Sequence, residues 1–68
     1  MKQKLYLIAN SALTKGKPLE NVVRDAVAGG VDIVQLREKD KSAGEVYTTA
    51  LKIKNILKDF PETIFLIN

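Results

Sequence analysis

Four polar side chains near the ends of apolar segments could take part in chemistry. Gln35, Arg37 and Lys39 recur at every second position, and Asn68 directly follows an apolar run. An arginine guanidinium can hold two phosphate oxygens at once, and a lysine adds a mobile positive charge. A glutamine amide both donates and accepts hydrogen bonds, which suits the edge of a heterocycle. The pattern indicates a site for an anionic ligand.

Exposed ion pairs are an alternative use of the same residues. Arg37 and Lys39 could pair with neighbouring acids in a solvated loop, where such pairs contribute little energy. The acids within reach are Glu38, Asp40 and Glu45. Spacing alone favours this interpretation. Gln35 counts against it, because an apolar strand interior rarely carries an amide without a partner.

The chain contains neither cysteine nor histidine. This excludes a disulfide, a thiolate zinc site, a cysteine nucleophile and a histidine base within it, and no catalytic residue is assigned. No apolar run approaches the ~20 residues of a membrane span. The basic start precedes an apolar stretch shorter than the ~7–15 residues of a signal peptide. We therefore expect mature, cytoplasmic protein with no membrane contact.

The net charge of +3 is unevenly distributed. Residues 1–17 contain no acidic residue, and their basic residues are Lys2, Lys4, Lys15 and Lys17. A basic edge could contact nucleic acid, but these lysines are not interleaved with aromatic residues. We expect a solvated strand end and loop, and no nucleic-acid partner.

Apolar runs at residues 5–9, 31–36 and 63–67 predict strands that are covered on both faces. A first helix is predicted between the first two runs, with Pro18 in its first turn and Gly29-Gly30 at its end. Its apolar face would comprise Leu19, Val22, Val23, Ala26 and Val27.

A second helix is predicted to begin after Ser42, because Ser42 and Glu45 have the spacing of a capping box. Pro61 closes this segment. The apolar stripe of the helix would comprise Val46, Ala50, Ile53 and Leu57, widened by Tyr47, Leu51 and Ile56.

The resulting order is βαβαβ, and connections of roughly 20 residues suit parallel strands in an α/β fold. Right-handed crossovers would place both helices on one face of the sheet. We expect the other face to be uncovered and to carry residues such as Leu5, Leu7, Ile33, Phe65 or Ile67. A (β/α)8 barrel of ~250 residues would cover it. We therefore expect residues 1–68 to be the N-terminal portion of a single, incomplete TIM-barrel domain.

The sequence resembles the thiamine-phosphate synthase family over essentially its whole length. The resemblance is carried by residues 5–8, Gly16, residues 26–40, Ser42 and residues 65–68, of which Ala-Gly-Gly-Val and Gln-Leu-Arg-Glu-Lys are the most specific parts.

The resemblance implies a TIM-barrel transferase that joins hydroxymethylpyrimidine pyrophosphate to thiazole phosphate, giving thiamine phosphate and pyrophosphate. Direct contacts with the pyrimidine pyrophosphate would then be made by Gln35, Arg37, Lys39 and Asn68, with Leu36 and Glu38 in the same binding stretch. Tyr6 would line the pocket.

The resemblance also implies Mg²⁺, but its expected ligands lie beyond Asn68, so no metal ligand is assigned in this chain. The first strand ends in Ala9-Asn10, where the family commonly has Thr-Asp. With half a substrate site, the isolated chain is predicted to be inactive.

Two rival interpretations remain open. A related thiazole tautomerase shares the barrel, although it needs no clamp for pyrophosphate. The chain could also be a non-catalytic α/β module that forms homo-oligomers through its apolar face or strand edges.

Overall fold

The computed structural model describes residues 4–68, so the Lys2 charge and the first residues of the basic start lie outside the described residues. The elements follow the predicted order: β1 (Tyr6–Ala9), α1 (Leu19–Ala28), β2 (Ile33–Leu36), α2 (Ala43–Leu57) and β3 (Ile64–Ile67). The predicted loop after β1 also contains a short 3-10 helix, η1 (Ser11–Leu13).

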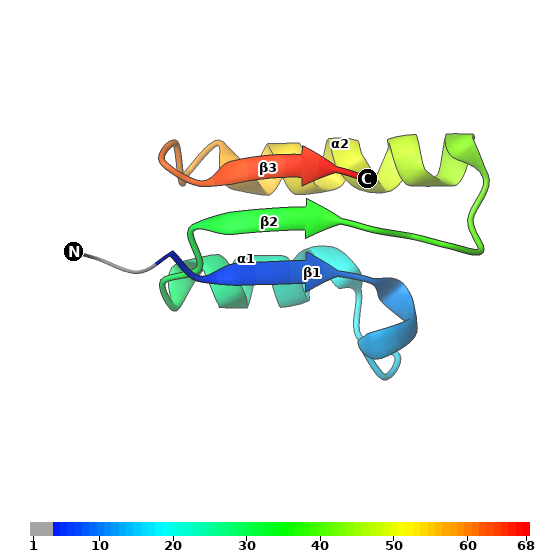
Figure 1. The fold of residues 1–68 in the computed structure, drawn as a ribbon, viewed down its shortest axis with the longest axis horizontal. Coiled ribbons are helices and arrows are strands. Elements are labelled where there is room, and N and C mark those ends of the chain that lie inside the picture. Colours follow the sequence, from blue (N-terminus) through cyan, green and yellow to red (C-terminus); the bar gives the residue numbers. More distant parts are fainter. Residues whose placement is uncertain (1–3) are drawn as a thin grey trace.

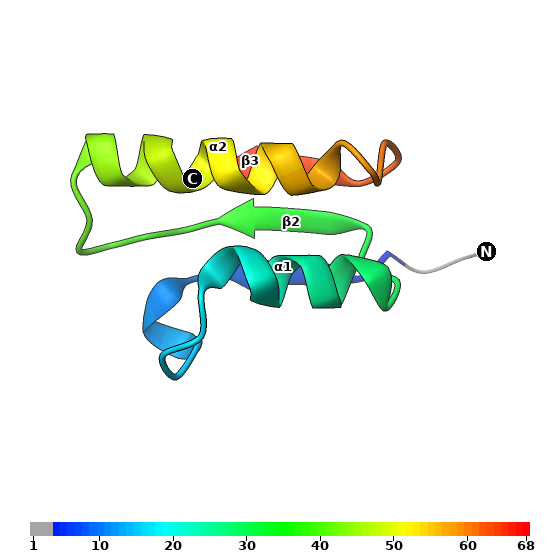
Figure 2. The same cartoon turned by 180° about the vertical axis from the view of Figure 1, so that it is seen from behind.

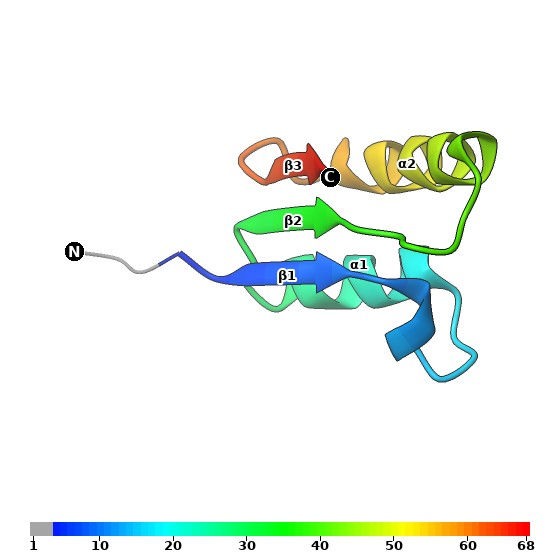
Figure 3. The ribbon, with the colours of Figure 1, turned by 45° about the vertical axis from the view of Figure 1, so that its right-hand side comes forward.

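The three strands form one parallel sheet in the order β1-β2-β3. All three arrows point the same way in Figure 3. The sheet lies in front of both helices in Figure 1, and the helices lie in front of it in the view from behind (Figure 2). Two layers therefore pack together and leave one face of the sheet without a helix, as predicted.

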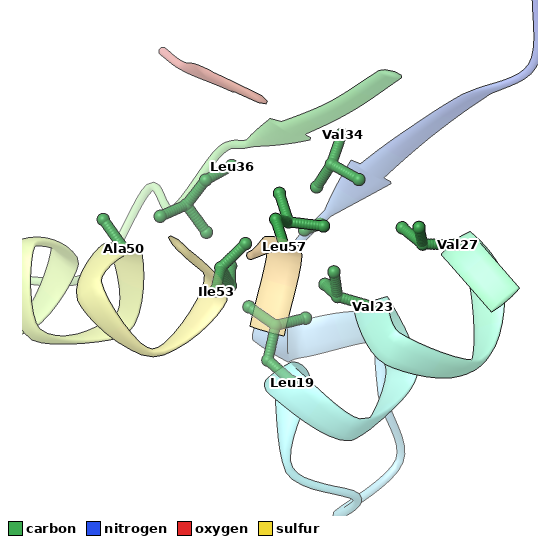
Figure 4. Packing of buried hydrophobic residues seen from close by; sticks show 9 residues of the cluster. Leu19, Val23, Val27, Val34, Leu36, Ala50, Ile53 and Leu57 are labelled. Carbon is green, nitrogen blue, oxygen red and sulfur yellow. The ribbon is translucent and has the colours of Figure 1, made fainter. Parts of the chain in front are cut away.

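The core lies between the helices and the near face of the sheet (Figure 4). Its most buried large side chains are Leu36, Ile53, Val23 and Val34. Burying such a side chain contributes about 1.5–3 kcal/mol, so this single layer of contacts holds the two crossover units together.

The helix-free face differs from the predicted one. Leu7 and Phe65 pack against the core, so the prediction that they are uncovered is wrong. The register pairs Leu36 with Ile67, which places Ile67 on the helix side as well. Of the five residues, only Ile33 lies on the helix-free side, and it is buried rather than uncovered. Strands that are apolar on both faces do not reveal which face meets the helices.

The helix-free face is formed by alternate residues of the three strands. Of its apolar side chains, four are between 42% and 59% exposed. In register order the face comprises Tyr6, Ile33 and Ile64, then Ile8, Gln35 and Leu66.

Helix α1 ends as its two glycines predict. Gly30 has φ +115°, and its N–H donates to the Val27 carbonyl at 3.1 Å, while Val31 N–H donates to the Ala26 carbonyl at 3.1 Å. These two bonds form a Schellman motif. Gly30 therefore supplies a conformation that other residues rarely adopt.

Helix α2 begins with the predicted capping box. The Glu45 N–H donates to Ser42 Oγ, and the Ser42 N–H donates to Glu45 Oε1. The predicted stripe is confirmed for Ala50, Ile53, Ile56 and Leu57, which are buried, but Tyr47 and Leu51 are exposed. One helix face can meet only one sheet face, so part of the broad apolar surface stays in solvent.

Within residues 4–68, no helix is both long and apolar enough to cross a membrane.

Candidate functional site

The carboxyl ends of the three strands meet at one edge of the sheet. Beyond the paired residues, the ladder continues by one step, because Arg37 N–H donates to the Ala9 carbonyl at 3.0 Å and Asn68 N–H donates to the Leu36 carbonyl at 3.0 Å. With the register extended by one residue, Asn10, Arg37 and Asn68 form the last row of this edge.

Gln35 and Arg37 lie on the helix-free side, because they alternate with the core residues Val34 and Leu36. Gln35 is half-buried and is paired in register with Ile8 and Leu66. None of the side-chain hydrogen bonds found among residues 4–68 involves the side chains of Gln35, Arg37 or Asn68. These three polar groups are therefore available to a ligand.

Leu36 points the other way. It is fully buried in the core between sheet and helices, so its side chain positions β2 and does not face the sheet edge. A contact between Leu36 and a ligand would have to come from its backbone.

The Glu38 carboxylate accepts hydrogen bonds from Ser11. Ser11 N–H donates to Glu38 Oε1 at 2.8 Å, and Ser11 Oγ–H donates to Glu38 Oε2 at 2.7 Å. In the alternative interpretation of exposed ion pairs, Glu38 and Glu45 were two of the three candidate acids, and both accept bonds from serines instead. Sequence reasoning missed the link with Ser11.

Lys39 lies one residue further, in the loop after β2, and is exposed. It lines a cleft of about 500 Å³ between the connection after β1 and the connection after β2. The cleft is lined by Asn10, Ser11, Ala12, Glu38, Lys39, Asp40 and Lys41. Lys39 could therefore reach an anion at the sheet edge from the loop.

Tyr6 lies on the helix-free face but at the other end of the strand. It is the first residue of β1 and pairs with Ile33. It lies four positions before Asn10, which is ~13 Å along a strand. The structure therefore brings Gln35, Arg37 and Asn68 together and leaves Tyr6 apart from them.

The described residues do not fit a magnesium site. Within residues 4–68, no three acidic side chains come together in a way that could hold a metal ion. Glu38, next to Arg37 in the chain, already accepts two hydrogen bonds from Ser11.

Comparison with known proteins adds a family to this geometry. The family model described as "Thiamine monophosphate synthase" matches residues 5–68. The thiamine-phosphate synthase of Clostridium botulinum strain Hall is 45% identical over 64 residues, covering 94% of this chain and 31% of that protein. The protein of the same name from Fusobacterium nucleatum is 42% identical over 65 residues, 96% of this chain and 31% of that protein.

A more distant relative from Clostridium acetobutylicum, also named thiamine-phosphate synthase, is 40% identical over 57 residues. The chain thus spans about a third of the length of the curated relatives that it matches. No solved structure gives a significant match.

Proposed function

Because this chain belongs to the thiamine monophosphate synthase family, we propose that it supplies the pyrophosphate-binding strand ends of a thiamine-phosphate synthase. This transferase would condense hydroxymethylpyrimidine pyrophosphate with thiazole phosphate in thiamine biosynthesis. The observation that carries the proposal is the placement of Gln35 and Arg37 on the helix-free side of one sheet edge, with Asn68 beside Arg37 in the last row.

Each residue has a distinct role in this proposal. The Arg37 guanidinium binds pyrophosphate oxygens in a bidentate manner, and Lys39 adds a second positive charge from the loop. The Gln35 amide bonds the pyrimidine edge, and Asn68 offers a further amide to the same substrate. Leu36 and Glu38 belong to the binding stretch as supporting residues, because their side chains are turned to the core and to Ser11.

The proposed reaction breaks the bond between the pyrimidine methylene carbon and the pyrophosphate oxygen. The electron pair leaves with pyrophosphate, and the thiazole nitrogen forms the new carbon–nitrogen bond. Negative charge therefore develops on the leaving group, where preorganised cations such as Arg37 and Lys39 lower the barrier most. Correct orientation of the two substrates lowers the barrier further, and no protein nucleophile is needed.

For the architecture, we infer that residues 1–68 form the first portion of a single TIM barrel. Sequential parallel strands with both helices on one side support it, because a barrel curves such units with the helices outside. The helix-free face, which includes Tyr6, would then line the barrel interior. Mg²⁺ stays part of the proposal, with ligands outside the described residues.

The partners in this proposal are small molecules. The exposed apolar side chains of the helix-free face also favour association between copies of the chain in isolation. With open edges at β1 and β3 and half of a substrate site, the 68-residue chain alone is expected to show no turnover.

A chimera tests the proposed function. This chain would replace the 64 matched residues of the C. botulinum relative, and thiamine phosphate formation would be measured with both substrates. We expect product to form at a rate within about tenfold of that of the intact relative. The relative without those residues provides the negative control.

The same preparation separates synthase from tautomerase chemistry. A chimera that isomerises the thiazole substrate but forms no thiamine phosphate would contradict the proposal. A folded chimera with neither activity would contradict it as well.

A further inference from the structure

A carboxylate clamp joins the two loops at the sheet edge. Both oxygens of Glu38 accept hydrogen bonds from Ser11, 27 residues away in the chain, at 2.8 and 2.7 Å. The pair is partly buried, and hydrogen bonds to an ionised carboxylate are about twice as strong as neutral ones. The clamp therefore fixes the connection after β2 to the connection after β1.

The backbone of Arg37 lies between this clamp and the sheet. Its own N–H donates to the Ala9 carbonyl, and the next residue, Glu38, holds Ser11. The main chain at Arg37 is thus held on both sides. Its guanidinium takes part in none of the side-chain hydrogen bonds found among residues 4–68. Because the main chain of Arg37 is already fixed, less conformational entropy is lost when its free guanidinium binds a ligand.

The hydrogen bonds of Glu38 also weaken an electrostatic conflict. A free carboxylate beside an anion site would repel pyrophosphate. Glu38 alternates with Arg37 and directs its charge to the donors of Ser11. Hydrogen-bond donors of Ser11 therefore bind both carboxylate oxygens and weaken this repulsion.

From this geometry we propose that Glu38 is a positioning residue, which acts through Ser11 to hold Arg37 in place for pyrophosphate. The inference rests on the proposed function and adds a residue that would not itself touch the substrate. Lys39 lies one residue beyond the clamp, so its placement should depend on Glu38 less than that of Arg37.

The test uses the chimera described above and inorganic pyrophosphate as the probe. Glu38→Ala should weaken pyrophosphate binding about ten- to a hundredfold, because small misplacements at a reactive site have effects of that size. It should also accelerate amide hydrogen exchange at Arg37 at least tenfold. Glu62→Ala, which removes an exposed glutamate before β3, is the matched control and should change neither quantity.

Ser11→Ala removes only the hydroxyl donor, so its effect should be smaller. In the Glu38→Ala background Ser11→Ala should have no further effect, because the two residues act as one unit. Additive effects would overturn the proposal. If Glu38→Ala fails to fold, Glu38→Gln and Ser11→Ala provide the same comparison in milder form.

A lower melting temperature with unchanged pyrophosphate affinity and unchanged exchange at Arg37 would show a merely structural role and overturn the inference. If the unsubstituted chimera does not bind pyrophosphate, the proposed function fails. In that case exchange at Arg37 still decides whether Glu38 positions it.

Discussion

Arg37 combines a fixed backbone with a guanidinium that is available for an anion. Its spacing from Gln35 predicts that the two side chains share one side of the strand, because successive side chains of a strand point in opposite directions. The Ser11–Glu38 link could not be predicted in this way, since nothing in local spacing relates residues from two different loops. The residues proposed to bind the substrate could thus be inferred from the sequence, whereas the residue proposed to position Arg37 required the structure.

Substitution of Gln35 should affect substrate binding strongly and the stability of the protein little. Gln35→Leu would extend the apolar row formed with Ile8 and Leu66, so the free energy of unfolding should change by less than about 0.5 kcal/mol. Losing one or two hydrogen bonds to the pyrimidine should raise KM for the pyrimidine substrate about tenfold. Urea unfolding and steady-state kinetics of the chimera measure the two effects.

Asn55→Leu, on the exposed side of α2, is the control and should leave KM unchanged. A KM for Gln35→Leu equal to that of the control would exclude Gln35 from the pyrimidine site.

At the scale of elements, both helix boundaries depend on single residues that the sequence identifies. The capping box before α2 and the glycine after α1 are local features, and local patterns were sufficient to predict them. The exposure of Tyr47 and Leu51 was not predictable locally, because it depends on which side of α2 meets the sheet.

Glu45 should give α2 a pH-dependent stability. Hydrogen bonds from the Ser42 backbone N–H, and then from its hydroxyl, lower the pKa of Glu45. A carboxyl with a lowered pKa in the folded state stabilises fully above its unfolded pKa of about 4.3. That stabilisation disappears as the pH falls through the lower folded value.

Glu45→Gln keeps the capping geometry and removes the charge. Its melting temperature should lie below that of the parent chain at pH 7, and the difference should vanish at acidic pH. A difference that is independent of pH would contradict this explanation.

Gly30 should tolerate substitution worse than Gly44. Gly30→Ala forces a side chain into φ +115°, which should cost more than about 1 kcal/mol of unfolding free energy. Gly44→Ala lies within α2, where its nearest contact would be Ser42 Oγ at 4.0 Å, and should stabilise by up to about 1 kcal/mol. Chemical denaturation of both variants measures these values, and equal effects would rule out the role of the Schellman turn.

At the scale of the whole molecule, the chain is one sheet layer and one helix layer with an apolar face left open. The length of the connections predicted parallel strands and helices on one side. The identity of the open face could not be predicted, because Leu7 and Ile8 are equally apolar and only packing against α1 and α2 distinguishes them.

The open face should cause self-association of the isolated chain. At low micromolar concentration, light scattering should give a mass well above the 7.5 kDa of one chain. The double variant Ile8→Thr/Leu66→Thr should give a monomer, since it makes the row around Gln35 polar with a β-branched residue that suits strands. Leu13→Thr, in η1 and away from this face, should not. A monomeric parent chain would contradict the view that the sheet lacks a covering layer.

The most direct test of the central claim is the affinity of the chimera for pyrophosphate after Arg37→Gln. Arg24→Gln is the matched control, because Arg24 is an exposed arginine of α1 and its loss changes the net charge equally. We predict a loss of about 10²–10³-fold in kcat/KM, with a parallel loss of pyrophosphate affinity, for Arg37→Gln only. Equal kinetics and equal affinity for the two variants would contradict the claim that this edge of the sheet binds the departing pyrophosphate.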